Sequence, residues 1–261
     1  MLRSRLLGVV LGCLACSNRS AAPADTDGGA AGAGGTPTDA PFEPGANVFN
    51  RELLHEVSIT VAESDLAQLD VMTDARVPAT IVFDGQTLSR VGVRNKGSSS
   101  FQATAQKPGF SIKFDEFVGG QRLDGLKKLS LNNTVQDPTW CTEILTYDTY
   151  RKAGQPAPRV AHAVVSLNGE PKGIYTLIEP INAQFLARHY GADLDQGNLY
   201  EGPWDFTKPV AMADLKDEVE EQRTREDLQA LTDVVLSPPD EDFPGRLAQV
   251  LCEHGTVGRE G

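Results

Sequence analysis

The chain has 261 residues, a formal net charge of −12 and 40% hydrophobic residues. This length and apolar content are enough for one sizeable core. The acidic balance argues against a nucleic-acid-binding protein, since such proteins present a basic surface. No interior stretch reaches the roughly 18 apolar residues that a membrane-spanning helix needs, which excludes that class.

The N-terminal residues have the pattern of an export signal. Two arginines precede the apolar run Leu6–Leu14, which is too short to cross a bilayer. The letters LACS that end the region resemble a bacterial lipoprotein processing site. We therefore expect a lipoprotein signal peptide over residues 1–16 and an exported protein anchored to the bacterial cell envelope by a lipid on Cys16. Processing at Cys13 and an ordinary signal peptide are the alternatives.

A low-complexity segment follows the signal. Residues 17–46 consist almost entirely of Gly, Ala, Ser, Thr, Pro and Asp, with a single Phe. Such a segment buries too little apolar surface to offset the entropy of ordering it. We interpret it as a flexible linker that precedes a folded domain over residues 47–251. Residues 252–261 have no periodicity and are interpreted as a separate tail.

The first half of the domain is rich in strand patterns. Apolar side chains alternate with polar ones in several short runs, and Asp84-Gly85 is a strong hairpin signal. A capped apolar spacing after Ser64 indicates a short helix. Strands are predicted over 55–61, 77–83, 88–93, 109–114 and 127–131, with a helix over 64–69.

The second half combines a hairpin with helices. Asp137 followed by Pro138 predicts the start of a helix that ends at Gly154. The tight turn Asn168-Gly169 joins two predicted strands. These strands cover 161–166 and 173–179, and further helices are predicted over 181–190, over 225–235 and from 246 onward.

Positive side chains gather around a turn that is rich in serine. Gly97 and three serines offer backbone and hydroxyl donors, and cations flank the turn on both sides. In so acidic a protein this pattern indicates an anion or phosphate cradle. The alternative is a solvated hairpin whose lysines protect a sheet edge from aggregation. The residues concerned are Arg94, Lys96, Ser98, Ser99, Lys107 and Lys113.

The cysteine and histidine pattern predicts no metal site. Export would permit a disulfide between Cys141 and Cys252, but two cysteines do not form a framework. The chain has no C-x-x-C motif, and its four histidines have no spacing suited to zinc.

The order of these elements resembles a known family. A glycine–serine turn, a strand lysine, a helix glutamate and a connecting strand follow one another as in a protein kinase. The sequence resembles the spore-coat CotH kinases, which are atypical kinases of the secretory pathway, from about Val48 to Leu251. The matching segments are Val91–Phe101, Lys107–Phe114, Leu126–Asn133, Glu143–Gly154, Leu167–Glu179 and Asn198–Tyr200.

The resemblance implies both a fold and a reaction. The implied fold class is α+β: a kinase-like N-lobe, made of a mainly antiparallel sheet with an inserted helix, followed by a hinge and the start of a helical C-lobe. The implied activity is ATP-dependent, magnesium-dependent phosphorylation of a protein substrate. Nucleotide, a protein substrate and the membrane lipid are therefore the expected partners.

The resemblance also implies a nucleotide site. Lys107 is the first choice for the lysine that contacts phosphate, and Lys113 is the second. Glu143 would pair with that lysine, and Glu179 would lie near the adenine. An exposed acid favoured by the helix dipole is the alternative for Glu143. The expected nucleotide-binding set is Arg94, Lys96, Ser98, Ser99, Lys107, Lys113, Glu143 and Glu179.

The segment that would complete the reaction is not found. In this family the catalytic and metal-binding aspartates lie in later Asp-Gly-Tyr-like and Pro-Trp-Asp-Leu-Asp-like stretches, and neither occurs here. Asp193 and Asp195 are assigned to a turn. The sequence thus predicts an incomplete domain with no catalytic or metal residues and little or no kinase activity. The alternative function is a non-catalytic surface lipoprotein whose β-rich module binds a protein or an envelope component.

Overall fold

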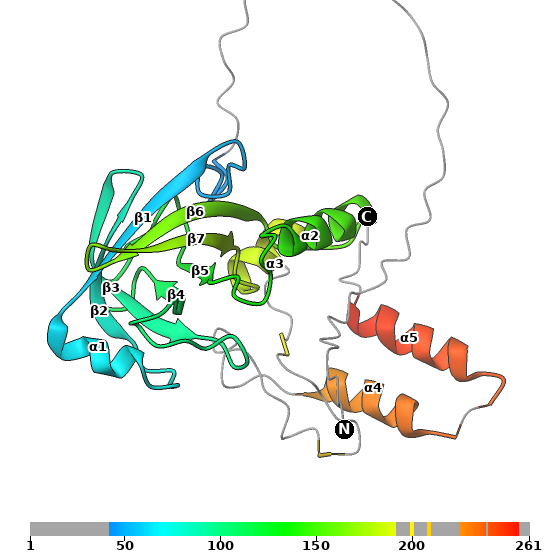
Figure 1. Cartoon of the computed structure of the whole chain (residues 1–261). Coiled ribbons are helices and arrows are strands. Elements are labelled where there is room, and N and C mark those ends of the chain that lie inside the picture. Colours follow the sequence, from blue (N-terminus) through cyan, green and yellow to red (C-terminus); the bar gives the residue numbers. More distant parts are fainter. Residues whose placement is uncertain (1–41, 192–198, 201–207, 210–224, 239, 256–261) are drawn as a thin grey trace, which may run out of the picture. The chain divides into compact units, whose positions relative to one another are not determined.

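The computed structural model describes residues 42–191, 199–200, 208–209, 225–238 and 240–255 (Figure 1). The chain divides into two compact units, of which the first is Asp39–Phe185 and the second contains Leu186–Gly261. The predicted signal peptide, the lipidation site at Cys16, most of the linker, and both Asp193 and Asp195 lie outside the described residues.

The first unit is built on seven strands. Their positions confirm the strands expected from apolar alternation, to within three residues at most ends. The strands are β1 Leu54–Val61, β2 Val77–Phe83, β3 Gln86–Lys96, β4 Gly109–Lys113, β5 Lys128–Asn132, β6 Val160–Leu167 and β7 Glu170–Ile178.

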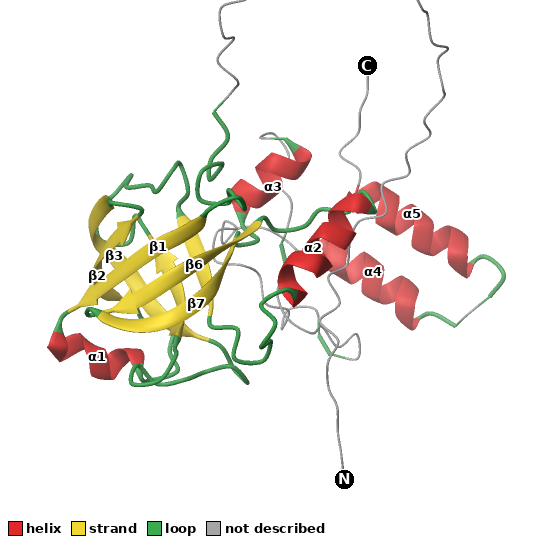
Figure 2. Ribbon diagram, turned by 45° about the horizontal axis from the view of Figure 1, so that its top comes forward, coloured by secondary structure: helices red, strands yellow, loops and turns green. Residues whose placement is uncertain are grey.

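These strands close into a barrel in the order β1-β2-β3-β4-β5-β7-β6 (Figure 2). Six neighbouring pairs are antiparallel, and the pair β1–β6 that closes the barrel is parallel. The predicted fold class was therefore wrong: the unit is a closed, mixed barrel and not a kinase-like α+β lobe with a helical second lobe. The parallel pair joins residues about a hundred positions apart, from Leu54↔His162 to Ile59↔Leu167, and no local pattern encodes such a contact.

Closure explains where the core lies. One side chain in two along each strand points into the barrel, and these side chains are buried to 5% exposure or less. The outer face then carries the alternate residues, which include most of the polar ones on β3, β4 and β5. The inner residues of those three strands are Val91, Val93, Phe110, Ile112, Leu129 and Leu131.

Asn168 helps to seal the parallel junction. It occupies the β6–β7 turn with a positive φ of 49°, a conformation that Asn tolerates well. Its side-chain oxygen accepts from the Val61 N–H at 2.8 Å, and its amide nitrogen donates to the Val61 carbonyl at 2.9 Å. The end of β1 therefore finds its hydrogen-bond partners in a side chain where the ladder runs out.

Three helices begin within this unit: α1 Glu63–Leu69, α2 Thr142–Lys152 and α3 Ala183–Tyr190. Helix α2 lies beside β6 on the outside of the barrel, and none of its residues is fully buried. Ile144 and Tyr147 are half-buried, as are Glu143, Asp148 and Arg151. The predicted stop at Gly154 is confirmed, because the helix ends at Lys152 and Gly154 has a φ of 75°.

Residues 42–49 cover one end of the barrel. Val48 and Phe49 are buried, and the Gly45 N–H donates to the Asp124 carbonyl at 2.6 Å. The Asp124 carboxylate accepts from the backbone N–H of Asn47 at 2.7 Å. The last residues that we assigned to the linker thus make defined contacts with the barrel.

The second unit contains α4 Glu226–Leu236 and α5 Phe243–Gly255, which pack against each other. Leu228 and Thr232 form the buried side of α4. In the described part of the chain, no helix has both the length and the apolar character to cross a membrane.

Candidate functional site

The outer face of β3, β4 and β5 is polar and rich in cations. Strand register places Arg94 opposite Ser111, and Ser111 opposite Ser130. One row away, Lys113 lies opposite Lys128. Salt bridges offset part of this charge, since Arg94 pairs with the exposed Asp74 at 3.2 Å and Lys113 pairs with Glu116 at 2.8 Å. The predicted cation cluster therefore lies on the outer face of the barrel, where acidic residues neutralise part of its charge.

The central group of this surface joins β3, β5 and α2. The Lys96 ammonium donates to the side-chain oxygen of Asn132, and the amide nitrogen of Asn132 donates to Glu143 Oε1. The structure therefore brings Lys96 to Glu143 through one amide. We call Lys96, Asn132 and Glu143 the lysine–glutamate relay.

Burial sets the protonation behaviour of both ends of the relay. Desolvation lowers the pKa of Lys96, and the Glu143 carboxylate only partly restores it. Desolvation likewise raises the pKa of Glu143, against the hydrogen bond from Asn132 and the charge of Lys96. Burial therefore favours the neutral form at each end, and the charge of the other end partly opposes this.

Thr176 on β7 completes the surroundings of Glu143. It is the β-ladder partner of Asn132, and its hydroxyl lies close enough to lower the pKa of Glu143. Even so, Glu143 Oε2 and the Thr176 hydroxyl are buried without a well-formed hydrogen bond among the residues that the structure describes. The relay thus ends in a carboxylate oxygen that retains an unused acceptor capacity.

Polar contacts fix both ends of α2. At its start, the Asp137 carboxylate accepts from the Thr142 N–H at 2.9 Å, and hydrogen bonds lower the pKa of Asp137 to about 2. The predicted start of the helix was therefore wrong: α2 begins at Thr142, with Cys141 at the N-cap, and Asp137 reaches its first N–H from the preceding turn. Toward its other end, Asp148 receives hydrogen bonds from Arg51 at 2.9 Å and from Arg151 at 2.5 Å.

The serine-rich turn lies directly after Lys96. Gly97 has a φ of 123°, which glycine adopts without strain. Asn133 fixes the turn from below, because its amide donates to the carbonyls of Ser100 and Lys107, each at 2.8 Å. Ser99 accepts from Gln136 at 3.1 Å. Asn133, which follows Asn132 of the relay, therefore sets most of the shape of the turn.

A polar cavity opens beside this turn. It has a volume of about 130 Å³ and lies between residues 72–74 and residues 94–97. Its size suits an inorganic anion or one phosphate group. A larger hollow of about 230 Å³ runs across β1, β2 and β6. That hollow is lined mainly by apolar and uncharged residues, with Glu56 as its ionisable group.

The two lysines favoured from the sequence lie elsewhere. The Lys107 ammonium donates to the Thr134 hydroxyl at 3.3 Å and lies 5.1 Å from the centre of the Tyr175 ring. Lys113 is held by Glu116. Among the predicted lysines, Lys96 is thus the one that the structure links to Glu143.

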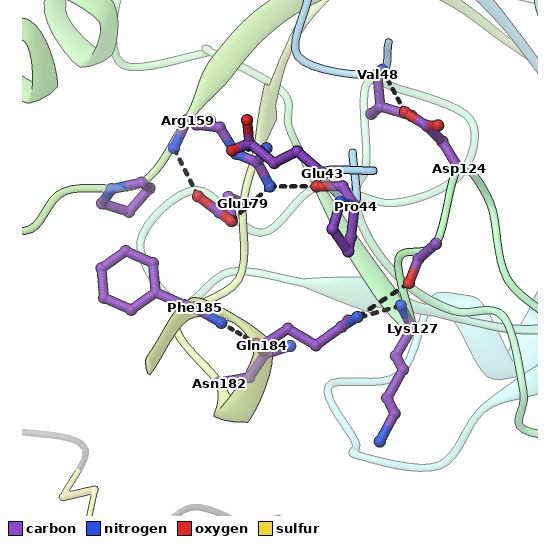
Figure 3. Close-up of polar contacts among 12 residues, drawn as sticks. Glu43, Pro44, Val48, Asp124, Lys127, Arg159, Glu179, Asn182, Gln184 and Phe185 are labelled. Atoms are coloured by element: carbon purple, nitrogen blue, oxygen red, sulfur yellow. Dashed lines mark hydrogen bonds and ion pairs between the residues drawn. The ribbon is translucent and has the colours of Figure 1, made fainter. Parts of the chain in front are cut away.

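Glu179 lies in a different network, at the end of the barrel that residues 42–49 cover (Figure 3). Its side chain is 4% exposed and accepts from the Arg159 guanidinium at 2.8 Å and from the Arg159 N–H at 3.0 Å. The same guanidinium contacts Glu43 at 2.9 Å and the Pro44 carbonyl at 2.6 Å. Glu179 therefore joins β7 to the start of β6 and to the N-terminal segment.

Three residues of the site were not singled out from the sequence. Asn132 and Asn133 lie at the end of β5, Thr176 lies within β7, and only the pair of adjacent asparagines offered a signal. In the part of the chain that the structure describes, no group of three or more His, Cys, Asp or Glu side chains is placed to hold a metal.

The chain shows a clear family relationship. The family model described as CotH kinase protein matches residues 93–251, which is more than half of the chain. These residues include most of the barrel and all of the lysine–glutamate relay. This protein therefore belongs to the CotH family.

Two curated relatives from Bacillus subtilis (strain 168) are similar in sequence. The inner spore coat protein H is 25% identical over 171 residues, which cover 65% of this chain and 45% of that protein. The inner spore coat protein H-like protein is 31% identical over 75 residues, or 29% of this chain and 23% of that protein. The matched region spans less than half of either relative.

Proposed function

We propose that this chain carries the nucleotide-binding part of a CotH-type, ATP- and magnesium-dependent protein kinase. The observation that supports the proposal is the relay itself: a half-buried lysine linked through Asn132 to a half-buried glutamate, within the region that matches the CotH kinase family. A lysine of this kind contacts nucleotide phosphates in kinases, and a glutamate holds it. ATP, when bound, supplies the phosphoryl group.

The residues present fit the phosphate part of ATP. Arg94 and Lys96 line the polar cavity, and the backbone turns at Gly97 beside them. The Lys96 ammonium has three N–H donors, of which one is directed to Asn132. In this proposal the other two donate to phosphate oxygens. In this proposal Lys96 and Arg94 bind the phosphates, and Asn132 and Glu143 orient the lysine.

The rest of the proposal concerns turnover and location. We propose that this polypeptide transfers little phosphate by itself, because the sequence patterns that supply the family's catalytic aspartates are not found in it. We also propose export and attachment to the cell envelope through a lipid on Cys16. The name of the spore coat relative supports a location outside the cytoplasm.

A lysine comparison tests the nucleotide site. We expect MgATP to bind the wild-type chain, and Lys96→Met to weaken binding by about tenfold or more, the loss expected when a hydrogen bond to a charged group is removed. Titration calorimetry measures the dissociation constant. Lys113→Met is the matched control, since it removes an equal charge from the same barrel face, and it should leave binding within about twofold.

Two results would contradict the proposal. If Lys96→Met and Lys113→Met weaken binding equally, the relay has no special role and the effect is one of general charge. If the wild-type chain fails to bind MgATP at millimolar concentration, the non-catalytic binding module becomes the better description. Phosphate transfer from radiolabelled ATP, measured on the same sample, tests the proposed lack of turnover.

A further inference from the structure

Lys96 and Asn132 do not lie on neighbouring strands. Lys96 belongs to β3 and Asn132 to β5, and β4 runs between them. Adjacent strands are about 4.8 Å apart, so the two backbones are separated by about twice that distance. The lysine side chain must therefore pass over β4 to reach the amide.

Gly109 provides the space for this crossing. It is the β4 residue that pairs with Lys96 in the ladder. A Cβ atom at this position would lie 3.3 Å from Lys96 Cγ and 3.0 Å from the Lys96 carbonyl oxygen. The φ of Gly109 is not positive, so the backbone does not require glycine here. The missing side chain is what leaves the surface of β4 open to the lysine.

The chemistry of an amide suits the position between the two charged groups. Its oxygen accepts a hydrogen bond from an ammonium, while its N–H₂ group donates to a carboxylate. Asn132 makes one bond of each kind, to Lys96 and to Glu143. An aspartate would accept from the lysine but repel the glutamate, and a leucine would do neither.

We propose that Asn132 is a positioning residue of the nucleotide site, and that Gly109 is the gap through which Lys96 reaches it. This inference rests on the proposed function, because it assigns the residues that hold the phosphate-binding lysine. Asn132 couples the two charges through hydrogen bonds and keeps the ammonium over β4 before any nucleotide arrives.

The charged surroundings of the relay come from several elements. Arg94 on β3 lowers the pKa of Lys96, and Asp137 raises that of Glu143. Tyr147 on α2 faces the same carboxylate, whose charge raises the pKa of the phenol together with burial. Any measured pH profile of Lys96 therefore reports on this whole group, and variants must be compared with the wild type under identical conditions.

The first readout needs no nucleotide. The full chain is treated with a trace of acetic anhydride at a series of pH values, and acetylation of each lysine is measured by peptide mass spectrometry. We expect Asn132→Leu to shift the pH profile of Lys96, because the ammonium loses its acceptor. Lys107 and Lys113 serve as internal references and should keep their profiles.

The same measurement tests the glycine. Gly109→Ala should shift the pH profile of Lys96, whereas Gly119→Ala, with no atom within 4 Å of the new Cβ, should leave that profile unchanged.

A paired substitution separates positioning from general damage. Asn132→Asp alone places a second carboxylate beside Glu143 and should disturb the Lys96 profile. In the double variant Asn132→Asp/Glu143→Gln, the new glutamine amide can donate to the new aspartate, which still accepts from Lys96. The hydrogen-bond chain is then restored with its second link reversed, and the double variant should recover a Lys96 profile closer to the wild type than either single variant.

The second readout is MgATP binding by the same variants. We expect Asn132→Leu to weaken MgATP binding by about tenfold. The double variant should bind MgATP more tightly than Asn132→Asp alone. Two results would overturn the positioning role of Asn132. One is an unchanged Lys96 profile in Asn132→Leu, and the other is a double variant whose Lys96 profile is no closer to the wild type than those of the two single variants. If the profiles behave as expected while the wild type binds no MgATP, the relay stands and the proposed nucleotide function fails.

Discussion

Glu143 has two carboxylate oxygens with different surroundings. Oε1 accepts from Asn132, whereas Oε2 is buried beside the Thr176 hydroxyl without a well-formed bond among the described residues. Burial is the largest cause of the raised pKa of Glu143. The folded protein therefore holds the Glu143 proton more tightly than the unfolded chain does, whose carboxyl titrates near pH 4.5.

The raised pKa of Glu143 makes the stability of the protein depend on pH. A raised folded-state pKa contributes stability below the unfolded pKa, and this contribution is lost as pH rises through the folded value. We expect Glu143→Gln, which cannot ionise, to gain stability relative to the wild type as pH rises from near 4.5 to about 7.5. Urea unfolding of both proteins at the two pH values measures the difference.

A matched carboxylate shows whether the effect belongs to the relay. Glu63 is exposed at the start of α1, and Glu63→Gln should change stability by a similar small amount at both pH values. A Glu143→Gln variant whose stability relative to the wild type falls with rising pH would show that folding lowers the pKa of Glu143 instead of raising it.

At the scale of elements, α2 is the part of the site most dependent on polar contacts. None of its residues is fully buried, and Leu145 and Tyr150 are more than half exposed. The helix is instead fixed by Asp137 at its start and by Asp148 with its two arginines toward its end. Glu143 is carried by this helix, so the geometry of the relay depends on these anchors.

Loss of the Asp137 cap should loosen the start of α2. We expect Asp137→Ala to increase amide hydrogen exchange in the first turn of α2, because the Thr142 N–H loses its acceptor. The pKa of Asp137 is lowered to about 2, so the wild-type cap acts above the ordinary carboxyl pKa of 3.8 and is lost as pH falls toward 2.

The barrel strands provide the reference for this measurement. Exchange in β5 and β7 should be the same in Asp137→Ala as in the wild type, since their amides are protected by the closed sheet. Equal exchange of α2 in both proteins would mean that the cap is dispensable and that other contacts hold the helix.

At the scale of the whole molecule, the barrel and its N-terminal cover are joined by Arg159 and Glu179. Arg159 lies against the Phe49 ring at 4.9 Å as well as bonding Glu179, Glu43 and the Pro44 carbonyl (Figure 3). The 4% exposure of Glu179 makes this a buried ion pair. Without Glu179, Arg159 keeps Glu43 and the Pro44 carbonyl as partners, but its guanidinium loses the buried carboxylate and its backbone N–H loses its acceptor.

We therefore expect Glu179→Ala to act on stability. The free energy of unfolding should fall by about 1 to 3 kcal/mol, the cost of leaving a buried donor without its acceptor. Chemical denaturation measures the loss, with the exposed Glu63→Ala as the control that stays within about 0.5 kcal/mol. MgATP affinity of the folded variant should be unchanged. Weaker binding with unchanged stability would instead support the predicted place of Glu179 beside the adenine.

Local patterns in the sequence were enough to predict the strands and the family. Alternation over residues 77–83 and 109–114, and the Asn168-Gly169 turn, predicted elements that the structure confirms. The cationic serine turn after Lys96 was also visible, because it depends on neighbours along the chain. The resemblance to CotH kinases rested on the order of short motifs along the chain. That order can be recognised without knowing how the strands pair.

The closure of the barrel and the pairing of Lys96 with Glu143 could not be predicted from local patterns. Closure depends on the parallel pairing of β1 with β6, far apart in sequence. The choice of Lys96 depends on the register of three strands and on the empty position at Gly109. Alternation assigns a side chain to a face of the sheet, but contacts across that face are set by register, which long-range packing fixes.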